Sequence, residues 1–252
     1  MITSINGANW FYSVMGQGET LLFLHGGLEA SASYTRLLAE LSQTFRVVAV
    51  DRRGHGRSED TDAPYDYPLM AEEVYDFTQT IGLERFHIVG YSDGANIGFH
   101  IASDHPESIK GLVAVSGNYK GLSGMSEAWL ARLPLLTADF ARQQMDAVVT
   151  QYMELNPRPD FTAYMDKTRA IWLEETVVSP EKMAAIRAKT LLICGDRDIV
   201  LPEQSLAMRS LIPGAALMML PDTGHTIFQD FACKPPAMAA LSVIKDFLAK
   251  CG

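Results

Sequence analysis

Short runs of apolar residues alternate along the chain with amphipathic stretches. Each run has the length of a buried strand and is followed by the Gly, Asp or Ser residues that end strands. The six runs are Leu21–Leu24, Arg46–Val50, Phe86–Gly90, Lys110–Val115, Thr190–Cys194 and Ala216–Leu220. Because nearly continuous apolar runs are typical of strands buried on both faces, they predict a mostly parallel sheet.

Two of the stretches between the runs carry an apolar stripe with helical spacing. Such helices cover the faces of a sheet, so the alternation predicts an α/β fold. The two stripes are Met70, Val74, Phe77 and Ile81, and Met238, Leu241, Ile244 and Leu248.

One segment, residues 118–181, contains no strand-like run. Pro134, Pro157 and Pro159 divide it into short helices, because proline ends a helix near the preceding residue. We therefore expect a single domain, with an α/β core from residues 1–117 and 182–252 and a helical lid from 118–181. The aromatic residues of this segment either pack the lid onto the core or form a wall facing a substrate. Its tyrosines and tryptophans are Tyr119, Trp129, Tyr152, Tyr164 and Trp172.

Composition narrows the choice of partner and compartment. The chain has 252 residues, 48% of them hydrophobic, and a net charge of −9 without a basic block, which argues against binding nucleic acid. Cys194, Cys233 and Cys251 form no close pair and no metal-binding spacing, as is typical of a reducing compartment. No signal-like N-terminus occurs, and no apolar run reaches the roughly 18 residues of a membrane span. These features predict a cytoplasmic protein with no membrane partner.

The segment Gly90-Tyr91-Ser92-Asp93-Gly94 is a G-x-S-x-G motif between a predicted strand and a predicted helix. The turn is tight enough to require small residues two positions either side of the serine. It exposes the Ser92 hydroxyl at the carboxyl edge of the sheet, where the helix N-terminus favours a developing oxyanion. Ser92 is therefore the candidate nucleophile.

A serine nucleophile needs a general base, and His225 is the best placed of the six histidines. It follows the last predicted strand, in a loop that can hold an imidazole over the sheet edge. For the acid that orients the base, Asp198 and Asp196 compete at the end of another strand run. We favour Asp198, which is nearer the next helix, and expect Asp196 to form a turn or an ion pair with Arg197.

A tetrahedral oxyanion requires two donors. The backbone N–H of Gly27, in His25-Gly26-Gly27, and that of Asp93 are the candidates.

These motifs together resemble the α/β-hydrolase superfamily almost end to end. HGG at 25–27 resembles its oxyanion loop, DRRGHGRS at 51–58 a turn near the site, GYSDG at 90–94 the elbow, GDRD at 195–198 the acid loop and GH at 224–225 the base loop. The resemblance implies an eight-stranded sheet with a helical lid after the sixth strand. It also implies that the turn at 51–58 is structural, with no catalytic role.

Within the superfamily, the motif Gly-x-Ser-Asp-Gly is most similar to the biphenyl hydrolase-like and enol-lactonase-like branches. In some amino-acid ester hydrolases of this type, an acid after the serine recognises an ammonium group, and the resemblance carries that role to Asp93. Alternatively, the Asp93 side chain caps the helix and favours its N-terminus electrostatically. Dehalogenases of this fold use an aspartate nucleophile and are therefore disfavoured.

The expected activity is hydrolysis of a small or medium ester or lactone through an acyl-enzyme, without metal or organic cofactor. Many Met and aromatic residues in the predicted lid favour an enclosed, apolar pocket. Two alternatives remain: a C–C bond hydrolase or lyase with the same triad, and a non-catalytic or slowly hydrolysing ligand sensor. The sequence leaves the natural substrate and the formation of a homodimer open.

Overall fold

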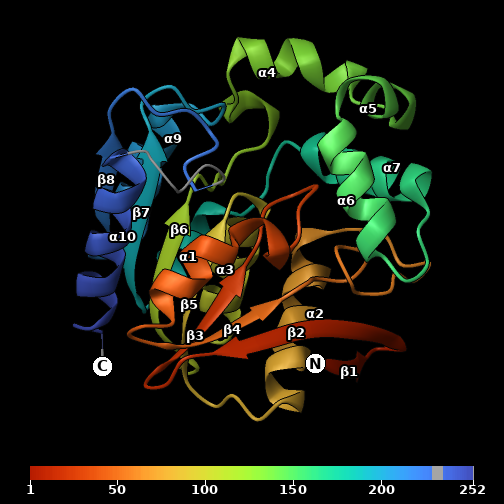
Figure 1. The fold of residues 1–252 in the computed structure, drawn as a ribbon. Helices are drawn as coiled ribbons and strands as arrows, with labels where there is room; N and C mark the ends of the chain where they lie inside the picture. Colours follow the sequence, from red (N-terminus) through yellow and green to blue (C-terminus); the bar gives the residue numbers. More distant parts are fainter. Residues whose placement is uncertain (229–234, 252) are drawn as a thin grey trace.

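The computed structural model describes residues 1–228 and 235–251, and its strands form one sheet in the order β1-β2-β4-β3-β5-β6-β7-β8 (Figure 1). The strands are β1 (Ile2–Ile5), β2 (Ala8–Met15), β3 (Thr20–Leu24), β4 (Arg46–Val50), β5 (Phe86–Tyr91), β6 (Ile109–Val115), β7 (Lys189–Gly195) and β8 (Ala216–Leu220). The strands from β4 through β3 to β8 all pair in parallel. The pairs β1–β2 and β2–β4 are antiparallel. The predicted eight-stranded α/β-hydrolase sheet is confirmed.

The register aligns the carboxyl ends of the central strands. Leu24 of β3 lies opposite Val50 of β4 and Gly90 of β5. The three segments that follow these strands are therefore neighbours at one edge of the sheet. They are the HGG loop, the turn that begins at Asp51, and the elbow that contains Ser92.

Alternate residues of the central strands face two separate apolar layers. In β3, Leu21 and Phe23 pack with α1 and α10, whereas Leu22 and Leu24 pack in the layer that contains α2 and α3. Both faces are thus covered, which is why these strands read as continuous apolar runs. The helices that flank the sheet are α1 (Thr35–Leu41), α2 (Tyr67–Thr80), α3 (Asp93–Asp104), α8 (Pro180–Ala185), α9 (Pro202–Leu211) and α10 (Pro235–Leu248), and a 3₁₀ turn, η1 (Ser31–Tyr34), precedes α1.

Between β6 and β7 the chain forms a run of short helices, seen above the sheet in Figure 1. They are η2 (Leu122–Gly124), α4 (Glu127–Arg132), η3 (Leu133–Leu135), α5 (Ala138–Gln144), α6 (Asp146–Leu155) and α7 (Phe161–Trp172). The predicted proline breaks are confirmed: Pro134 lies in η3, and Pro157 and Pro159 separate α6 from α7. The boundary of the lid at residue 181 stays a prediction, and α8 crosses it.

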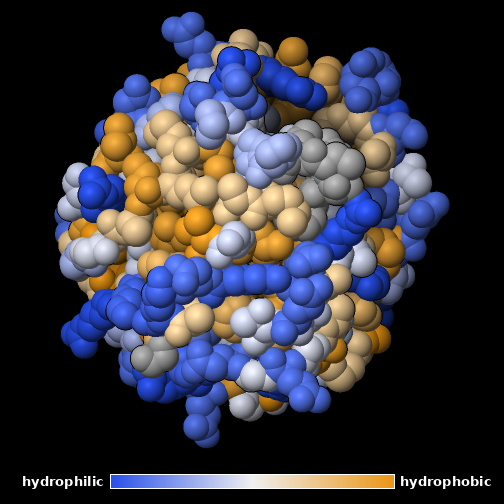
Figure 2. Space-filling view, turned by 60° about the vertical axis from the view of Figure 1, so that its left-hand side comes forward, coloured by the Kyte–Doolittle hydropathy of each residue, from blue (hydrophilic) through white to orange (hydrophobic). Residues whose placement is uncertain are grey.

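The stripe predicted for the C-terminal helix is wrong at one position. Met238 is 49% exposed, and Ala237 takes its place in the buried face of α10 with Leu241, Ile244 and Leu248. Seen from the side of α10, apolar surface gathers between hydrophilic bands (Figure 2). Exposed apolar side chains of α9, β8 and α10 include Leu206, Met219, Met238 and Val243.

The described cysteines form no disulfide, and the described helices include no candidate membrane span. Cys194 and Cys251 are buried free thiols, and Cys233 lies outside the described residues. Within residues 1–228 and 235–251, no helix combines the length and the apolar character needed to cross a bilayer.

Candidate active site

The elbow between β5 and α3 holds Ser92 in a conformation that side chains rarely adopt, with φ of 52° and ψ of −119°. A Cβ atom on Gly90 would lie 2.4 Å from the carbonyl oxygen of Gly94. A Cβ atom on Gly94 would lie 2.2 Å from the carbonyl oxygen of Leu24. The predicted need for small residues on both sides of the serine is therefore confirmed.

The structure brings Ser92, His225 and Asp198 into one hydrogen-bonded chain. His225 Nε2 lies 3.0 Å from Ser92 Oγ, and His225 Nδ1 lies 2.6 Å from Asp198 Oδ1. The Asp198 side chain is fully buried and that of His225 is largely buried. This is the geometry in which a carboxylate holds a histidine as the base for a serine.

Further hydrogen bonds fix the Asp198 carboxylate. Ser116, in the left-handed conformation just after β6, donates its hydroxyl to Oδ2 at 2.6 Å, and the Val200 N–H donates to Oδ1 at 3.1 Å. Burial alone would raise the pKa of Asp198, but the hydrogen bond and charge of His225, together with the hydrogen bonds from Ser116 and Val200, outweigh it and lower the pKa. Burial likewise opposes the charged form of His225, but the hydrogen bond and charge of Asp198 raise its pKa overall.

The competing residues have other partners. Asp196 is exposed and accepts the Thr223 N–H at 3.0 Å, which fits the predicted turn, whereas Arg197 pairs with Asp222. The remaining histidines contact backbone carbonyls or acidic side chains other than those of the triad. They are His25, His55, His87, His100 and His105.

The two candidate oxyanion donors lie beside the nucleophile, since Gly27, Ser92 and Asp93 line the same cavity. Asp93 is the first residue of α3, so its N–H has no acceptor within the helix. A Cβ on Gly27 would meet Asp93 Oδ2 at 2.3 Å and the Trp172 ring at 2.7 Å, so only glycine fits there. The roles of both N–H groups stay predictions.

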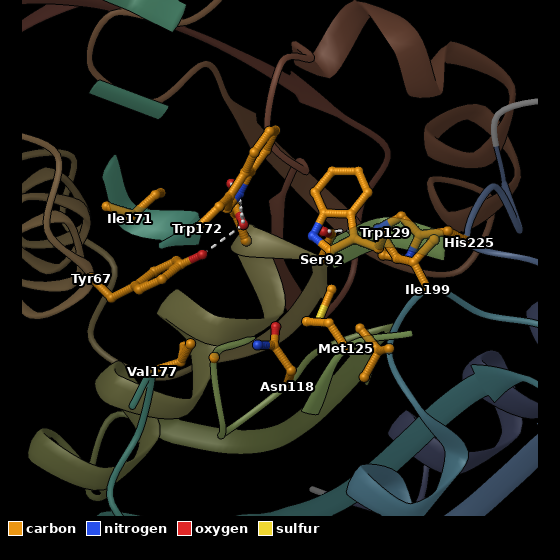
Figure 3. A pocket seen from close by; sticks show the side chains of 14 residues that line it. Tyr67, Ser92, Asn118, Met125, Trp129, Ile171, Trp172, Val177, Ile199 and His225 are labelled. Atoms are coloured by element: carbon orange, nitrogen blue, oxygen red, sulfur yellow. Dashed lines mark hydrogen bonds between the residues drawn. The ribbon is translucent and has the colours of Figure 1, made fainter. Parts of the chain in front are cut away.

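The Asp93 side chain differs from one expectation. It does not cap α3, whose N-cap is Ser92 without a side-chain bond. Instead, its Oδ1 accepts the Tyr67 hydroxyl at 2.8 Å and the Trp172 indole N–H at 3.1 Å, as the dashed lines in Figure 3 show. The carboxylate is 3% exposed, and its charge still lies in the first turn of the helix.

A cavity of about 150 Å³ opens over Ser92. Its apolar walls come from both the core and the inserted helices (Figure 3): Met125, Trp129, Ile171, Trp172, Val177, Ile199 and Val200. Of the five tyrosines and tryptophans of the insertion, Trp129 and Trp172 face the cavity, whereas Tyr119, Tyr152 and Tyr164 belong to the apolar core. Tyr67, Asp93 and His225 are its ionisable lining residues within the described part of the chain, where no group of His, Cys, Asp and Glu residues could hold a metal.

Sequence reasoning missed Glu29, which lies two residues after Gly27 and within the electrostatic range of His225. The Tyr34 hydroxyl donates to the Glu29 carboxylate, the Tyr34 and Tyr91 rings lie 5.5 Å apart, and the Tyr91 hydroxyl donates to the His225 carbonyl. Burial raises the pKa of Glu29 to about 7. No motif marks this residue. Ser116 was equally missed, although a polar residue directly after a buried strand is a usable signal.

Comparison with known families agrees with this geometry. The model of the alpha/beta hydrolase fold family matches residues 19–171, which include the elbow and most of the inserted helices. The chain belongs to this family.

Curated relatives of this alpha/beta hydrolase cover most of its length. It is 27% identical to a putative carbamate hydrolase, RutD, of Shigella flexneri serotype X (strain 2002017), over 81% of this chain and 84% of that protein. It is 26% identical to a 2-hydroxymuconate semialdehyde hydrolase of Pseudomonas sp. (strain CF600), over 93% of this chain and 88% of that protein. The enol-lactonase of Burkholderia xenovorans LB400 has the same fold, with a TM-score of 0.76, 21% identity and coverage of 99% and 100% of the two chains.

Proposed function

We propose that this alpha/beta hydrolase cleaves a small or medium carboxylic ester or lactone through an acyl-enzyme intermediate. The observation that carries the proposal is the hydrogen-bond chain from Asp198 through His225 to Ser92, which ends in a largely apolar cavity. A putative carbamate hydrolase among the relatives and an enol-lactonase of the same fold are both compatible with attack on an acyl carbon.

Each residue of the chain has one task in this reaction. His225 takes the Ser92 proton as the hydroxyl attacks the carbonyl carbon, and the N–H groups of Gly27 and Asp93 hold the resulting oxyanion. The imidazolium then protonates the leaving alcohol. Water, deprotonated by His225, releases the acid from Ser92, while the Asp198 carboxylate stabilises the imidazolium in both steps.

The cavity supports an uncharged acyl group as the substrate class. No Lys or Arg is among its described lining residues, so a carboxylate on the acyl part would gain no partner and would face Asp93. The Asp93 carboxylate already accepts hydrogen bonds from Tyr67 and Trp172, so it does not require a substrate ammonium group as a partner. We therefore place neutral esters and lactones before amino-acid esters.

Labelling with a fluorophosphonate tests the proposal. We expect the wild type to be labelled and to hydrolyse p-nitrophenyl esters or lactones, and Ser92→Ala to lose both, with turnover reduced on the order of 10⁴-fold or more. Ser103→Ala, on the same helix, is the matched control and should behave as the wild type. Activity retained by a clean Ser92→Ala preparation would overturn the triad.

Assays with these esters and lactones, with amino-acid esters and with a substrate that has a cleavable carbon–carbon bond separate the alternatives. A labelled enzyme that is slow on every ester but cleaves a carbon–carbon bond would favour the C–C hydrolase or lyase. A chain that binds these compounds without label or turnover would favour the sensor. A preference for amino-acid esters would assign ammonium binding to Asp93.

A further inference from the structure

The turn after β4 places a fully buried guanidinium behind the HGG loop. Arg52 is 1% exposed, and its Nη2 donates to the carbonyl oxygen of Gly26 at 2.9 Å and to that of His25 at 3.1 Å. This turn was expected to be structural only. Its contact with the loop that carries a candidate oxyanion donor gives it a second role.

The Gly26 carbonyl and the Gly27 N–H belong to one peptide group. In a trans peptide the C=O and N–H bonds point in opposite directions. The groups that bind the Gly26 oxygen, on Arg52 and His25, do not line the cavity, so this oxygen is held away from it and the Gly27 N–H is turned toward it. Gly27 lines this cavity together with Ser92 and Asp93.

His25 holds the same carbonyl from a second direction. Its Nε2 lies 3.1 Å from the backbone N–H of Arg52, which can only donate, so the ring proton is on Nδ1. Nδ1 then donates to the Gly26 oxygen at 2.8 Å. Burial lowers the pKa of His25 well below its ordinary value, which keeps this neutral tautomer. Arg52 thus fixes the Gly26 carbonyl directly and also orients the histidine that supports it.

The charge of Arg52 also acts on Asp93, the residue after the nucleophile. Within the described residues, its Nε and Nη1 have no hydrogen-bond partner, and Asp93 is the charged group that most favours its protonated form. Arg53, the next residue, is different: its guanidinium binds Glu73 at 2.8 Å and Asp60 at 2.8 Å. A fixed positive charge near the nucleophile stabilises a developing oxyanion, because it needs no reorganisation during the reaction.

We propose that Arg52 is a positioning residue of the oxyanion hole, which holds the Gly26–Gly27 peptide with its N–H facing Ser92. This inference rests on the proposed acyl-transfer function. It predicts that loss of Arg52 weakens the transition state more than the binding of substrate.

The test compares Arg52→Met with Arg53→Met, its neighbour in the same turn. With p-nitrophenyl butyrate, we expect Arg52→Met to lose about 10- to 100-fold in kcat at nearly unchanged KM, since a misplaced oxyanion donor costs somewhat less than a removed one. Its affinity for phenylboronic acid, which forms a tetrahedral anion on the serine, should fall by a similar factor. Arg53→Met should keep the wild-type kcat and the wild-type affinity for phenylboronic acid per folded molecule. Arg52→Lys, which retains a charged donor, should lose less kcat than Arg52→Met.

Circular dichroism and thermal melting establish the folded fraction of each variant. If either Met variant does not fold, Arg52→Lys and Arg53→Lys are compared in the same way, and only the first should lose kcat. If the wild type is active and the Arg52 variant is equally active, this inference alone is overturned. The same holds if the Arg53 variant loses as much kcat as the Arg52 variant. A wild type that is neither labelled nor active overturns the proposed function and this inference with it.

Discussion

The protonation of His225 sets the pH range in which Ser92 can be activated. Its pKa is raised above the ordinary value of 6.5, because burial, which lowers it, is outweighed by Asp198 together with the charges of Glu29 and Asp93. Only the neutral imidazole can accept the serine proton, so kcat/KM should rise with pH, reach half its maximum above pH 6.5 and then level off. A pH profile of ester hydrolysis measures this midpoint. A midpoint below the ordinary histidine value would contradict the assignment of the base.

Glu29 should move that midpoint. Its carboxylate is one of the charges that raise the pKa of His225, so Glu29→Gln should shift the half-maximal pH of kcat/KM to a lower value. Gln retains an acceptor for the Tyr34 hydroxyl. The control is Glu40→Gln, whose carboxylate pairs with Lys245 and should leave the profile unchanged.

The Glu29 carboxyl group should also make the free energy of unfolding depend on pH. Burial raises its pKa from 4.5 to about 7 on folding, so the folded chain keeps a proton that the unfolded chain has released. This contribution to the free energy of unfolding is full below about pH 4.5 and is lost as the pH rises toward 7. Urea titrations across this range should therefore show a shallower decline for Glu29→Gln than for the wild type.

At the scale of elements, the contact between α3 and β3 holds the elbow in place. Gly94→Ala would place a methyl group 2.2 Å from the Leu24 carbonyl oxygen and 2.6 Å from that of His25. Both are backbone atoms, so the clash could be relieved only by moving the main chain. We expect Gly94→Ala to lose at least about 100-fold in kcat/KM, since small misplacements of reacting groups have effects of this size, together with a lower melting temperature.

The matched control lies one turn along the same helix. Gly98→Ala would meet only side-chain methyl groups of Leu112 and Ile88, at 3.2 and 3.3 Å, which can shift slightly. Alanine also favours the helix more than glycine does. This variant should therefore keep its activity, and an equal loss in both variants would show that helix packing in general, not the elbow, is at fault.

The strands β3 to β8 could be predicted from their apolar runs, and they agree with the predictions within one residue at each end, although β8 at the sheet edge is partly exposed. The pattern alone missed β1 and β2, because these antiparallel strands at the sheet edge mix exposed and buried positions. Ser92, His225 and Asp198 could be found because each follows a strand in a recognisable motif. The place of Ser116 directly after β6 could mark it as a candidate, but its contact with Asp198, 82 residues further along the chain, could not be read from the sequence. The contact of Tyr34 with Glu29 has no sequence motif.

At the scale of the whole molecule, the core supplies the nucleophile and the inserted helices supply much of the cavity wall. Core residues such as Gly27 and Ser92 line the cavity with Trp129 of α4 and Trp172 of α7. The two indoles meet edge to face with their ring centres 5.5 Å apart. Under the proposed function, the inserted helices therefore form much of the wall that limits the substrate, whereas the core carries the reacting groups.

The cavity volume sets an expected chain length. A cavity near 150 Å³ holds a molecule of about six non-hydrogen atoms, so kcat/KM for p-nitrophenyl esters should be highest for acyl chains of about two to six carbons and fall for longer ones. Trp129→Ala removes one wall and should move the optimum to longer chains. Leu130→Ala, at a residue that does not line the cavity, should not. An optimum that stays in place in Trp129→Ala would mean that the acyl group binds elsewhere and that the alcohol part faces the inserted helices.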